Sequence, residues 1–367
     1  MPSWDVISKE LKNELKKDPD AINRKRRECI NKLSLMVDRN VIVYYSGWLQ
    51  HPDCPVAISD TDMNGFMNVI CNLDKSKGLD LILHTPGGSV AATESIANYL
   101  RNVFGDDIRA FVPHLAMSGG TILSCACKEI IMGSHSSIGP VDPQFGPRSA
   151  YAVVEEFNEA LEDVKENPNT ALVWREIISQ YHPTLVSECQ KAIEWSGEIT
   201  KKLLKTGMFK DCEDKDELSE KAVNDLNNHT DTKNHGRHID INMARESGLK
   251  VTRLEDDKEL QDCVLTLHHV YMFTFSNTRI AGLIESNNGN SFSMVRPEDP
   301  RTNEAIKKST TKFLKTVIEA MIIIGIVVFI CGLFGCYSDG SFGEPNSLIA
   351  IGFAIIAVSA LVRYKYR

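Results

Sequence analysis

The chain has 367 residues, of which 43% are hydrophobic and 25% are charged, a composition typical of a globular protein with a sizeable core. Its net charge of −8 gives no reason to expect nucleic acid as a partner. The ten cysteines lack the spacing of a zinc or thioredoxin motif, and the closest pair is the C-x-C of Cys125 and Cys127. We therefore expect buried free thiols in a reducing compartment.

Residues 1–38 are polar and strongly charged, with runs such as KELKNELKK and NRKRREC, and they predict a helical segment. This stretch contains no apolar core segment, so a secretory signal peptide is not expected. The basic cluster Arg24–Arg27 is expected to be a solvated helix face. A contact with anionic lipid headgroups is the alternative.

The character of the sequence changes after residue 39. NVIVYYSGW (Asn40–Trp48) is β-branched and aromatic and predicts a strand, as does LDLILH, which the tight turn TPGG follows. Residues Ser89–Gly105 have apolar positions at helical spacing between a serine and a glycine, which is typical of a capped helix. IRAFVP, GGTILSCACKE and IIMGS then predict a strand, a helix and a strand. This alternation predicts an α/β fold with a parallel sheet and crossover helices.

We expect this domain to extend over residues 39–286. Residues 150–206 are acidic and helical in pattern and predict a helical insert. Residues 211–235 are rich in Asn and Asp and predict a loop, whereas residues 238–275 are of mixed α/β character and include the strand-like run CVLTLHHVYMFTF. Residues 287–316 predict a polar linker.

Two apolar runs without any charge follow the linker, MIIIGIVVFICGLFGCY and LIAIGFAIIAVSALV, and they predict two transmembrane helices within residues 317–363. Lysines precede the first run and basic residues follow the second, whereas the link SDGSFGEPN has none. By the positive-inside rule both ends are cytoplasmic. We therefore expect a multi-pass protein of the cell inner membrane with its large domain in the cytoplasm. A buried helical hairpin in a soluble core is the alternative.

The segment PHLAMSGGT places Ser118 and two glycines between a predicted strand and a predicted helix. A serine nucleophile needs a hydroxyl exposed at a sharp turn, backbone N–H groups that face the developing oxyanion, and a base. A second glycine pair, Gly87 and Gly88, also ends a strand and opens a helix. Because the strand ends of a parallel sheet line one edge, both turns are expected to face the same crevice. Two ordinary strand-to-helix turns are the alternative, and neither turn matches a nucleotide-binding motif.

The motifs TPGG, AMSGGT and SIGPVDPQ, in this order, resemble the Clp-fold serine proteases of the crotonase superfamily, which include the Clp-type peptidase and signal peptide peptidase. The chain is more similar to the membrane-associated serine dehydrogenase proteinase family, at PHLAMSGGT, SSIGPVDPQ and HGRHIDINMARESGLKV. The resemblance covers residues 40–260. It implies a Clp/crotonase-like fold, a homo-oligomer and Ser118 as the nucleophile. It also implies an oxyanion hole built from backbone N–H groups at Gly87, Gly88 and Gly119.

The general base is the most open part of the predicted site. His235 is similar to a histidine of the same family, and a Ser118–His235 pair with Asp142 as the orienting carboxylate would supply the three roles of a triad. Asp142 as a plain turn cap is the alternative. Other candidate bases are the lysines Lys201, Lys202 and Lys205, as in signal peptide peptidases, and the histidines His114, His135 and His238.

The remaining histidines predict no metal site. His229, His235 and His238 form a loose cluster, but no Cys, Asp or Glu falls at a tight ligand spacing with them. His268 and His269 lie in the strand-like apolar run and are expected in the core.

The sequence thus predicts a membrane-anchored serine peptidase that hydrolyses peptide bonds through an acyl-enzyme and needs no cofactor or metal. Its expected partners are a peptide or protein substrate, the membrane lipid bilayer and further copies of the chain. A non-catalytic membrane scaffold on the same fold is one alternative, since a fold does not fix a function. An acyl-thioester hydrolase of the crotonase type is another.

Overall fold

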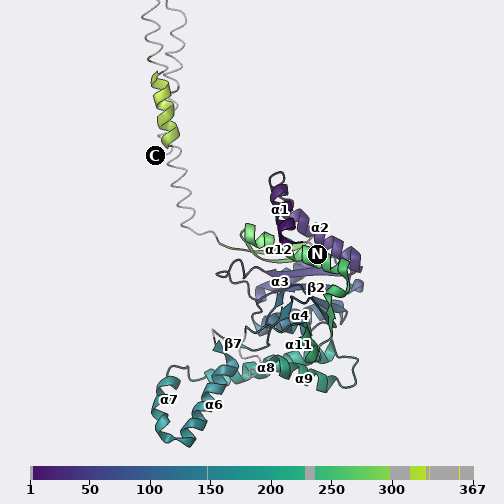
Figure 1. The fold of residues 1–367 in the computed structure, drawn as a ribbon, viewed down its shortest axis with the longest axis vertical. Coiled ribbons are helices and arrows are strands. Elements are labelled where there is room, and N and C mark those ends of the chain that lie inside the picture. The colour runs from purple at the N-terminus through teal and green to yellow at the C-terminus, as the bar shows by residue number, and fades with distance from the viewer. Residues whose placement is uncertain are drawn as a thin grey trace, which may run out of the picture. The chain divides into compact units, whose positions relative to one another are not determined.

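A computed structural model of the chain describes residues 3–146, 148–227, 236–297, 315–327, 330 and 355. The chain divides into two compact units, Met1–Arg296 and Pro297–Arg367. The first unit is an α/β domain whose helices and strands alternate along much of the chain (Figure 1). In the second unit, residues 315–327 are helical.

The helices and strands of the first unit have the following bounds. The α-helices are α1 (Trp4–Leu15), α2 (Ala21–Val37), α3 (Asp60–Ile70), α4 (Val90–Phe104), α5 (Gly119–Cys125), α6 (Ala150–Glu166), α7 (Ala171–Ile178), α8 (Leu185–Thr206), α9 (Lys215–Asn227), α11 (Ile241–Glu246) and α12 (Lys258–Asn277). Short 3₁₀ helices are η1 (Lys75–Lys77), η2 (Pro168–Thr170) and η3 (Leu254–Asp256). The strands are β1 (Asn40–Ser46), β2 (Leu79–His84), β3 (Ile108–Val112), β4 (Leu115–Ala116), β5 (Glu129–Met132), β6 (Ser137–Ile138), β7 (Gln144–Phe145), β8 (Arg148–Ser149), β9 (Val251–Arg253), β10 (Ile280–Ser286) and β11 (Ser291–Val295).

The described strands form a seven-stranded central sheet in the order β11-β10-β1-β2-β3-β5-β9. The strands from β1 to β9 in this order pair in parallel, with α4 and α5 in the connections between β2, β3 and β5. Strands β10 and β11 form an antiparallel hairpin that pairs with β1. The predicted α/β class and the parallel core of the sheet are therefore confirmed, and the antiparallel edge is an addition. Two small sheets, β4–β6 and β7–β8, lie outside the central one.

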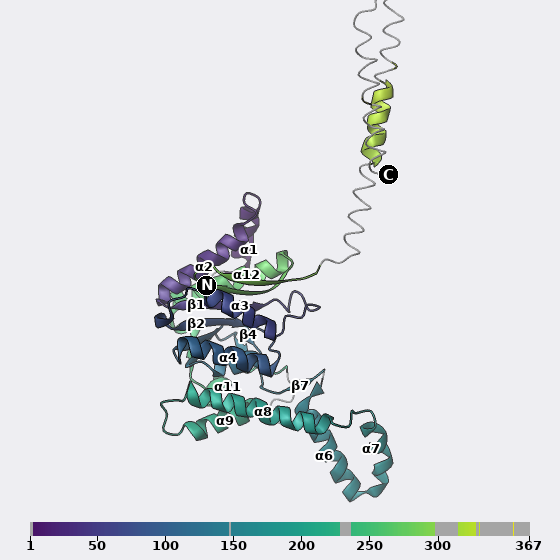
Figure 2. The ribbon, with the colours of Figure 1, turned by 180° about the vertical axis from the view of Figure 1, so that it is seen from behind.

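Helices cover both faces of the central sheet (Figures 1 and 2). Because side chains alternate along a strand, Leu79, Leu81 and Leu83 of β2 face a layer made by α3, α4, α5, α8, α9 and α11. Ile82 faces the opposite layer, which α1, α2 and α12 form. Burial on both faces explains why the central strands are almost continuously apolar in the sequence.

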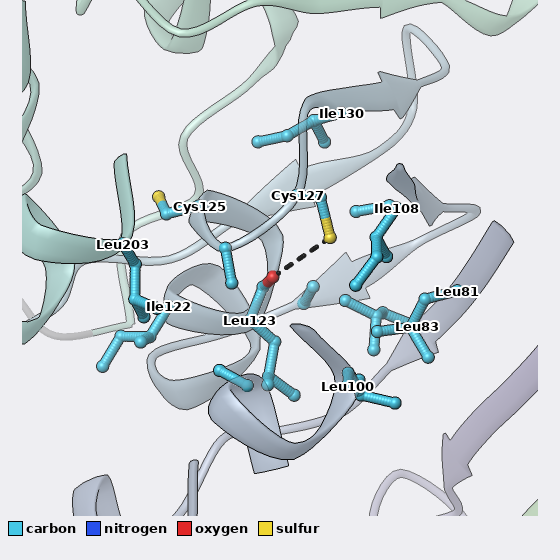
Figure 3. Packing of buried hydrophobic residues seen from close by; sticks show 14 of the residues in the cluster. Leu81, Leu83, Leu100, Ile108, Ile122, Leu123, Cys125, Cys127, Ile130 and Leu203 are labelled. Carbon is cyan, nitrogen blue, oxygen red and sulfur yellow. Dashed lines mark hydrogen bonds between the residues drawn. The ribbon is translucent and has the colours of Figure 1, made fainter. Parts of the chain in front are cut away.

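Helix α5 lies deep in the first of these layers. Figure 3 shows Ile122 and Leu123 of α5 among Leu100 of α4 and side chains of β2, and all three are at most 3% exposed. The helix ends near Cys127, whose Sγ donates to the Leu123 carbonyl at 3.3 Å. The segment that starts directly after Ser118 is thus fixed by core packing.

Residues 150–206 contain the helices α6, α7 and α8. Helices α6 and α7 extend away from the sheet in both views (Figures 1 and 2). Helix α8 returns to the core, where Ile199, Leu203 and Leu204 are buried against the layer that contains α5. The helical character predicted for this region is thus present in the structure.

The strand-like interpretation of residues 263–275 is wrong, because they lie within α12. The helix contacts α1, α2 and β10. Its Val264, Leu267 and Tyr271 are all fully buried at helical spacing. A helix that is buried on more than one side loses its polar face, so its sequence resembles a buried strand.

Two further expectations are corrected. The region 211–235 is not wholly a loop, because residues 215–227 form α9, which packs on α8 through buried Ala222, Val223 and Leu226. Its polar composition comes from a wide solvated face. The linker expected from residue 287 begins later, because residues 291–295 form β11.

The predicted transmembrane pair, residues 317–363, lies outside the described residues except for 317–327, 330 and 355. Within the part of the chain that the structure describes, no helix combines the length and the apolar composition needed to cross a bilayer.

Candidate active site

Two turns meet at the carboxyl ends of β2 and β3. The first, Thr85–Gly88, follows β2, and the second, centred on Ser118, follows the short strand β4. Backbone bonds join them directly, because the Thr85 N–H donates to the Leu115 carbonyl at 3.0 Å and the Thr85 carbonyl accepts from the Met117 N–H at 3.0 Å. The expectation that both glycine pairs face one crevice therefore holds in the structure.

Ser118 has an unusual backbone conformation, with φ 50° and ψ −111°. A side chain seldom takes a positive φ, and such strain is held only where the surroundings impose it. Here the Ser118 carbonyl accepts from the N–H groups of Thr121 and Ile122 at 2.8 and 3.1 Å, which starts α5. The Ser118 hydroxyl makes no hydrogen bond to any described residue and is partly exposed. The Ser118 side chain therefore does not cap the helix that follows it.

The glycines of the two turns are in contact. Gly87 has φ +89°, and a Cβ built on it would lie 2.6 Å from the Met117 carbonyl oxygen and 2.7 Å from Ser118 Cβ. A Cβ on Gly119 would lie 2.7 Å from Thr93 Oγ1 and 3.4 Å from the Gly88 nitrogen. Only residues without a side chain allow this approach. Among the described residues, no acceptor is hydrogen-bonded to the N–H of Gly88 or Gly119.

A third segment, residues 139–142, lies against the Ser118 turn. Thr121 Oγ1 donates to the Gly139 carbonyl at 2.8 Å and accepts from the Gly139 N–H at 3.0 Å. A Cβ on Gly139 would lie 3.1 Å from the Ser118 nitrogen. Asp142 follows on this segment, is 4% exposed and accepts from Gln144 Nε2 at 3.1 Å. Burial and this carboxylate raise the pKa of Tyr151 to about 12.

His235 lies outside the described residues, as do all of residues 228–235. The described residues on both sides of this stretch are bonded to the segment that carries Asp142. The Leu226 carbonyl accepts from the Val141 N–H at 3.3 Å, and Ile239 exchanges backbone bonds of 2.9 and 3.0 Å with Ile138. The described residues that flank residues 228–235 therefore lie against residues 138–141, the segment that packs on the Ser118 turn.

Ser118 lines a cavity of about 510 Å³. Most of its wall is apolar, and the polar groups in it are few. The described residues that line it are Ala57, Pro86, Gly87, Gly88, Ser89, Val90, Ala91, Ser118, Ile122, Val141, Asp142, Pro143, Gln144, Phe145, Ala192, Trp195 and Ser196. A concave, mainly apolar site with a few convergent polar groups is the usual form of a substrate site.

The sequence pattern of the family described as "ClpP-like SDH-type serine proteinase" matches residues 16–272. The chain belongs to this family. By its description this is a family of serine proteinases, and the Clp-type fold expected from the motifs of the chain is confirmed.

Two curated relatives are uncharacterized proteins of Methanocaldococcus jannaschii. MJ0137 is 42% identical over 98 residues, which are 27% of this chain and 34% of MJ0137. MJ1495 is 29% identical over 231 residues, which are 62% of this chain and 71% of MJ1495. The chain thus spans about a third of the first relative and about 70% of the second. No solved structure matches the chain.

The three lysines considered as bases lie on the surface, outside the described cavity wall. Each has a carboxylate partner on the surface: Lys201 with Glu220, Lys202 with Glu94, and Lys205 with Asp216. All three side chains are at least 33% exposed, and none is among the described residues that line the cavity. The structure therefore gives no support to a Ser–Lys pair.

The other candidate histidines also lie off the cavity wall. His114 packs on His84 on the α12 face of the sheet, with 5.5 Å between ring centroids. Burial, with His135 and His238 nearby, lowers the pKa of His114. None of these three described rings lines the cavity or is hydrogen-bonded to Ser118. In the described part of the chain, no group of His, Cys, Asp or Glu is arranged to hold a metal ion.

Sequence reasoning missed Trp195 and Phe145 as cavity residues. Trp195 is 43% exposed on α8, inside the region predicted only as a helical insert. A large apolar side chain exposed on an acidic helix is the signal that would have pointed to it. Phe145 follows the GPVDPQ motif, and no pattern in its immediate sequence marks it as part of a site.

Proposed function

We propose that this proteinase hydrolyses peptide bonds with Ser118 as the nucleophile. One observation carries the proposal: Ser118 is held at φ 50° and ψ −111° at a strand-to-helix turn, with its hydroxyl unbonded among the described residues and facing a cavity. A serine on a sharp, strained turn of this kind is typical of an exposed nucleophile. The strain is consistent with function, because a structural serine gains nothing from it.

The proposed oxyanion hole consists of the N–H groups of Gly88 and Gly119. Both lack an acceptor among the described residues, and the two glycines lie at the contact between the turns. Unpaired backbone donors are costly unless a ligand or water accepts their bonds. The Gly87 N–H, also expected in the oxyanion hole, already donates to Thr85 Oγ1 at 3.1 Å, so Gly87 instead supplies the close approach between the two turns. One such donor is worth about 10²–10³ in rate in a serine protease.

We propose His235 as the general base and Asp142 as its orienting carboxylate. The support comes from the neighbouring described residues: Leu226 and Ile239, on either side of residues 228–235, are both bonded to residues 138–141. Asp142 follows directly and is almost fully buried, so a histidine partner would share a low-dielectric site with it. The surface ion pairs of Lys201 and Lys205 leave the lysines less suited to this role.

The proposed reaction follows the serine protease sequence. Ser118 Oγ attacks the carbonyl carbon of the scissile bond while its proton passes to His235. The carbonyl oxygen becomes an oxyanion that accepts from the Gly88 and Gly119 N–H groups. The C–N bond then breaks as His235 protonates the leaving amine, which leaves an acyl-enzyme on Ser118. Water, deprotonated by His235, hydrolyses this ester and restores the hydroxyl.

A fluorophosphonate probe with mass-spectrometric mapping tests the proposal on the full-length protein in detergent. We expect an adduct on Ser118, its absence in Ser118→Ala, and a labelling rate reduced about 10²–10⁴-fold in His235→Ala. Ser196→Ala is the matched control, because Ser196 lines the same cavity with its hydroxyl bonded to backbone carbonyls. Full labelling of Ser118→Ala, or no labelling of the folded wild type, would reject Ser118 as the nucleophile.

We also propose that the apolar runs within residues 317–363 anchor the proteinase in the cell inner membrane, with the catalytic unit on the cytoplasmic side. The uncharged runs and their basic flanks support this. So do the exposed apolar side chains of the described residues 317–327, among them Ile323, Ile324 and Val327. Extraction of membranes with alkaline carbonate, followed by protease protection of closed vesicles, tests both parts. We expect self-association as well, measured by light scattering of the detergent-solubilised protein.

A further inference from the structure

His84 is a buried ring directly behind the first of the two active-site turns. It is the last residue of β2, it is fully buried, and Thr85 of the turn follows it. Its ring lies on the α12 face of the sheet, against His268, and is not among the described residues that line the cavity. His84 is thus next to the turn in the chain but outside the cavity.

The His84 ring begins a series of hydrogen bonds that links the two turns and ends at Met117, the residue before the nucleophile. Its Nδ1 accepts from the Leu115 N–H at 3.4 Å. The Leu115 carbonyl accepts from the Thr85 N–H, and the Thr85 carbonyl accepts from the Met117 N–H, each at 3.0 Å. Met117 precedes Ser118. The position of His84 Nδ1 therefore affects how Leu115 lies and, through Leu115, how the two turns are placed against each other.

The second ring nitrogen is without a partner. His84 Nε2 is buried and has no hydrogen bond among the described residues. Since Nδ1 accepts a bond, the proton of the neutral ring is on Nε2, so a buried N–H is left unsatisfied. Such a group destabilises a fold and calls for an explanation. A leucine at this position would avoid that cost but would not hold the Leu115 N–H.

The surroundings of His84 keep the ring neutral. Trp48 lies 4.4 Å from it and Tyr45 5.1 Å, between ring centroids, and His114 and His268 each lie at 5.5 Å. Burial and the charges of the two histidines lower the pKa of His84 well below its ordinary value. Nδ1 therefore remains an acceptor at neutral pH.

The titratable groups that surround His114 and His268 are again mainly histidines. His114 is also near His135 and His238, and His268 is near His269. Tyr45 faces the cluster with its hydroxyl on His268 Nδ1 at 3.1 Å, and burial raises the pKa of Tyr45 well above its ordinary value. The described charges that act on these rings all come from other histidines, so none of them favours a protonated ring.

We propose that His84 is a positioning residue for the peptidase reaction: its neutral ring holds the Leu115 N–H and thereby sets the Gly88 donor against Ser118. The proposal rests on the proposed function of Ser118. It assigns to His84 a role in orienting the oxyanion hole rather than in binding substrate or transferring a proton.

The test compares His84→Asn with His84→Leu in the full-length protein. The oxygen of an asparagine side chain is as many bonds from Cα as Nδ1, so His84→Asn keeps the acceptor. His84→Leu removes it, and His84→Gln moves the amide one bond farther away, which gives a second variant should the leucine protein not fold. His268→Leu is the control, because it removes a ring of the same cluster that bonds Tyr45 and not the turn.

Two readouts are measured. For fluorophosphonate labelling of Ser118, we expect the maximal rate to fall about tenfold or more in His84→Leu and His84→Gln, at an unchanged half-saturating probe concentration. His84→Asn and His268→Leu are expected to remain within about threefold of wild type. By hydrogen exchange, amides of residues 115–118 and of Gly88 are expected to exchange about tenfold faster in the same two slow variants only.

The outcomes separate the two proposals. Wild-type labelling and exchange in His84→Leu would overturn the positioning role, and so would an equal loss in His84→Asn, because the acceptor would then not matter. If wild-type Ser118 itself takes no label, the proposed function fails. In that case the hydrogen exchange of the four variants still decides whether His84 holds the turn.

Discussion

Gly87→Ala is the substitution that most directly tests whether contact between the two turns creates the site. A Cβ on Gly87 would lie 2.6 Å from the Met117 oxygen, 2.7 Å from Ser118 Cβ and 2.8 Å from the Gly119 nitrogen. All three are parts of the Ser118 turn and two are backbone atoms, so the turns must move apart. The positive φ of +89° adds about 1–2 kcal/mol of strain. Displacing a donor of the oxyanion hole costs about 2.7–4 kcal/mol of transition-state stabilisation.

We therefore expect the fluorophosphonate labelling of Gly87→Ala to be about 10²–10³-fold slower than that of wild type. Gly289→Ala is a matched control, because Gly289 has φ +87° and no heavy atom within 4 Å of its Cβ position. It should lose about 1–2 kcal/mol of unfolding free energy in urea, with labelling unchanged. If Gly87→Ala labels as fast as Gly289→Ala, the contact between the turns does not support catalysis.

Three further results are expected. Glu285→Gln should lower the unfolding free energy by about 3–5 kcal/mol in a urea titration, because Arg26, 4% exposed and 2.7 Å from the carboxylate, would keep a buried charge without its partner. Burial and neighbouring histidines lower the pKa of His268 to about 3, so the unfolded chain binds a proton at this ring before the folded protein does. The contribution of this ring to stability is therefore complete above pH 6.5 and falls towards pH 3, by up to about 1.4 kcal/mol per pH unit. His268→Gln should reduce this pH dependence in thermal melts between pH 7 and 4.5. Iodoacetamide at pH 8 should modify the exposed Cys71 at once but Cys125 only after unfolding, because burial raises the pKa of the Cys125 thiol to about 12; mapped peptides would show the order.

Local patterns predicted the parts of the fold that local chemistry determines. Ser89 and Gly105 do bound α4, since the Ser89 side chain accepts from the Ala92 N–H and the Gly105 N–H bonds the Arg101 carbonyl. The placement of Ser118 and Gly88 at one sheet edge followed from parallel topology alone. Both inferences need only hydrogen-bond geometry and strand direction, which sequence motifs carry.

The errors occurred where tertiary packing overrides the local pattern. The run around Tyr271 looked like a strand because α12 is buried on several sides. Asp80 lies inside the apolar run LDLILH and is fully buried, which is possible only because Arg39 and Arg109 bind it at 2.7 and 2.5 Å. Arg39 precedes β1 and Arg109 is in β3, so no window of sequence shows this arrangement. Trp195 reaches the cavity for the same reason, through the packing of α8.

The layer of α1, α2 and α12 contributes no residue to the described cavity wall, yet the proposed role of His84 makes it part of the active site. The His84 ring lies against His268 on the α12 face of the sheet, while the chain continues directly from His84 into the turn at Thr85–Gly88. The buried Arg26–Glu285 pair joins α2 to β10, and Tyr271 of α12 donates to the same carboxylate at 2.5 Å. Neither residue of this pair bonds the turn or the His84 ring, so a substitution at Glu285 should lower stability and leave the Ser118 labelling of the folded protein within about threefold of wild type, as expected for His268→Leu.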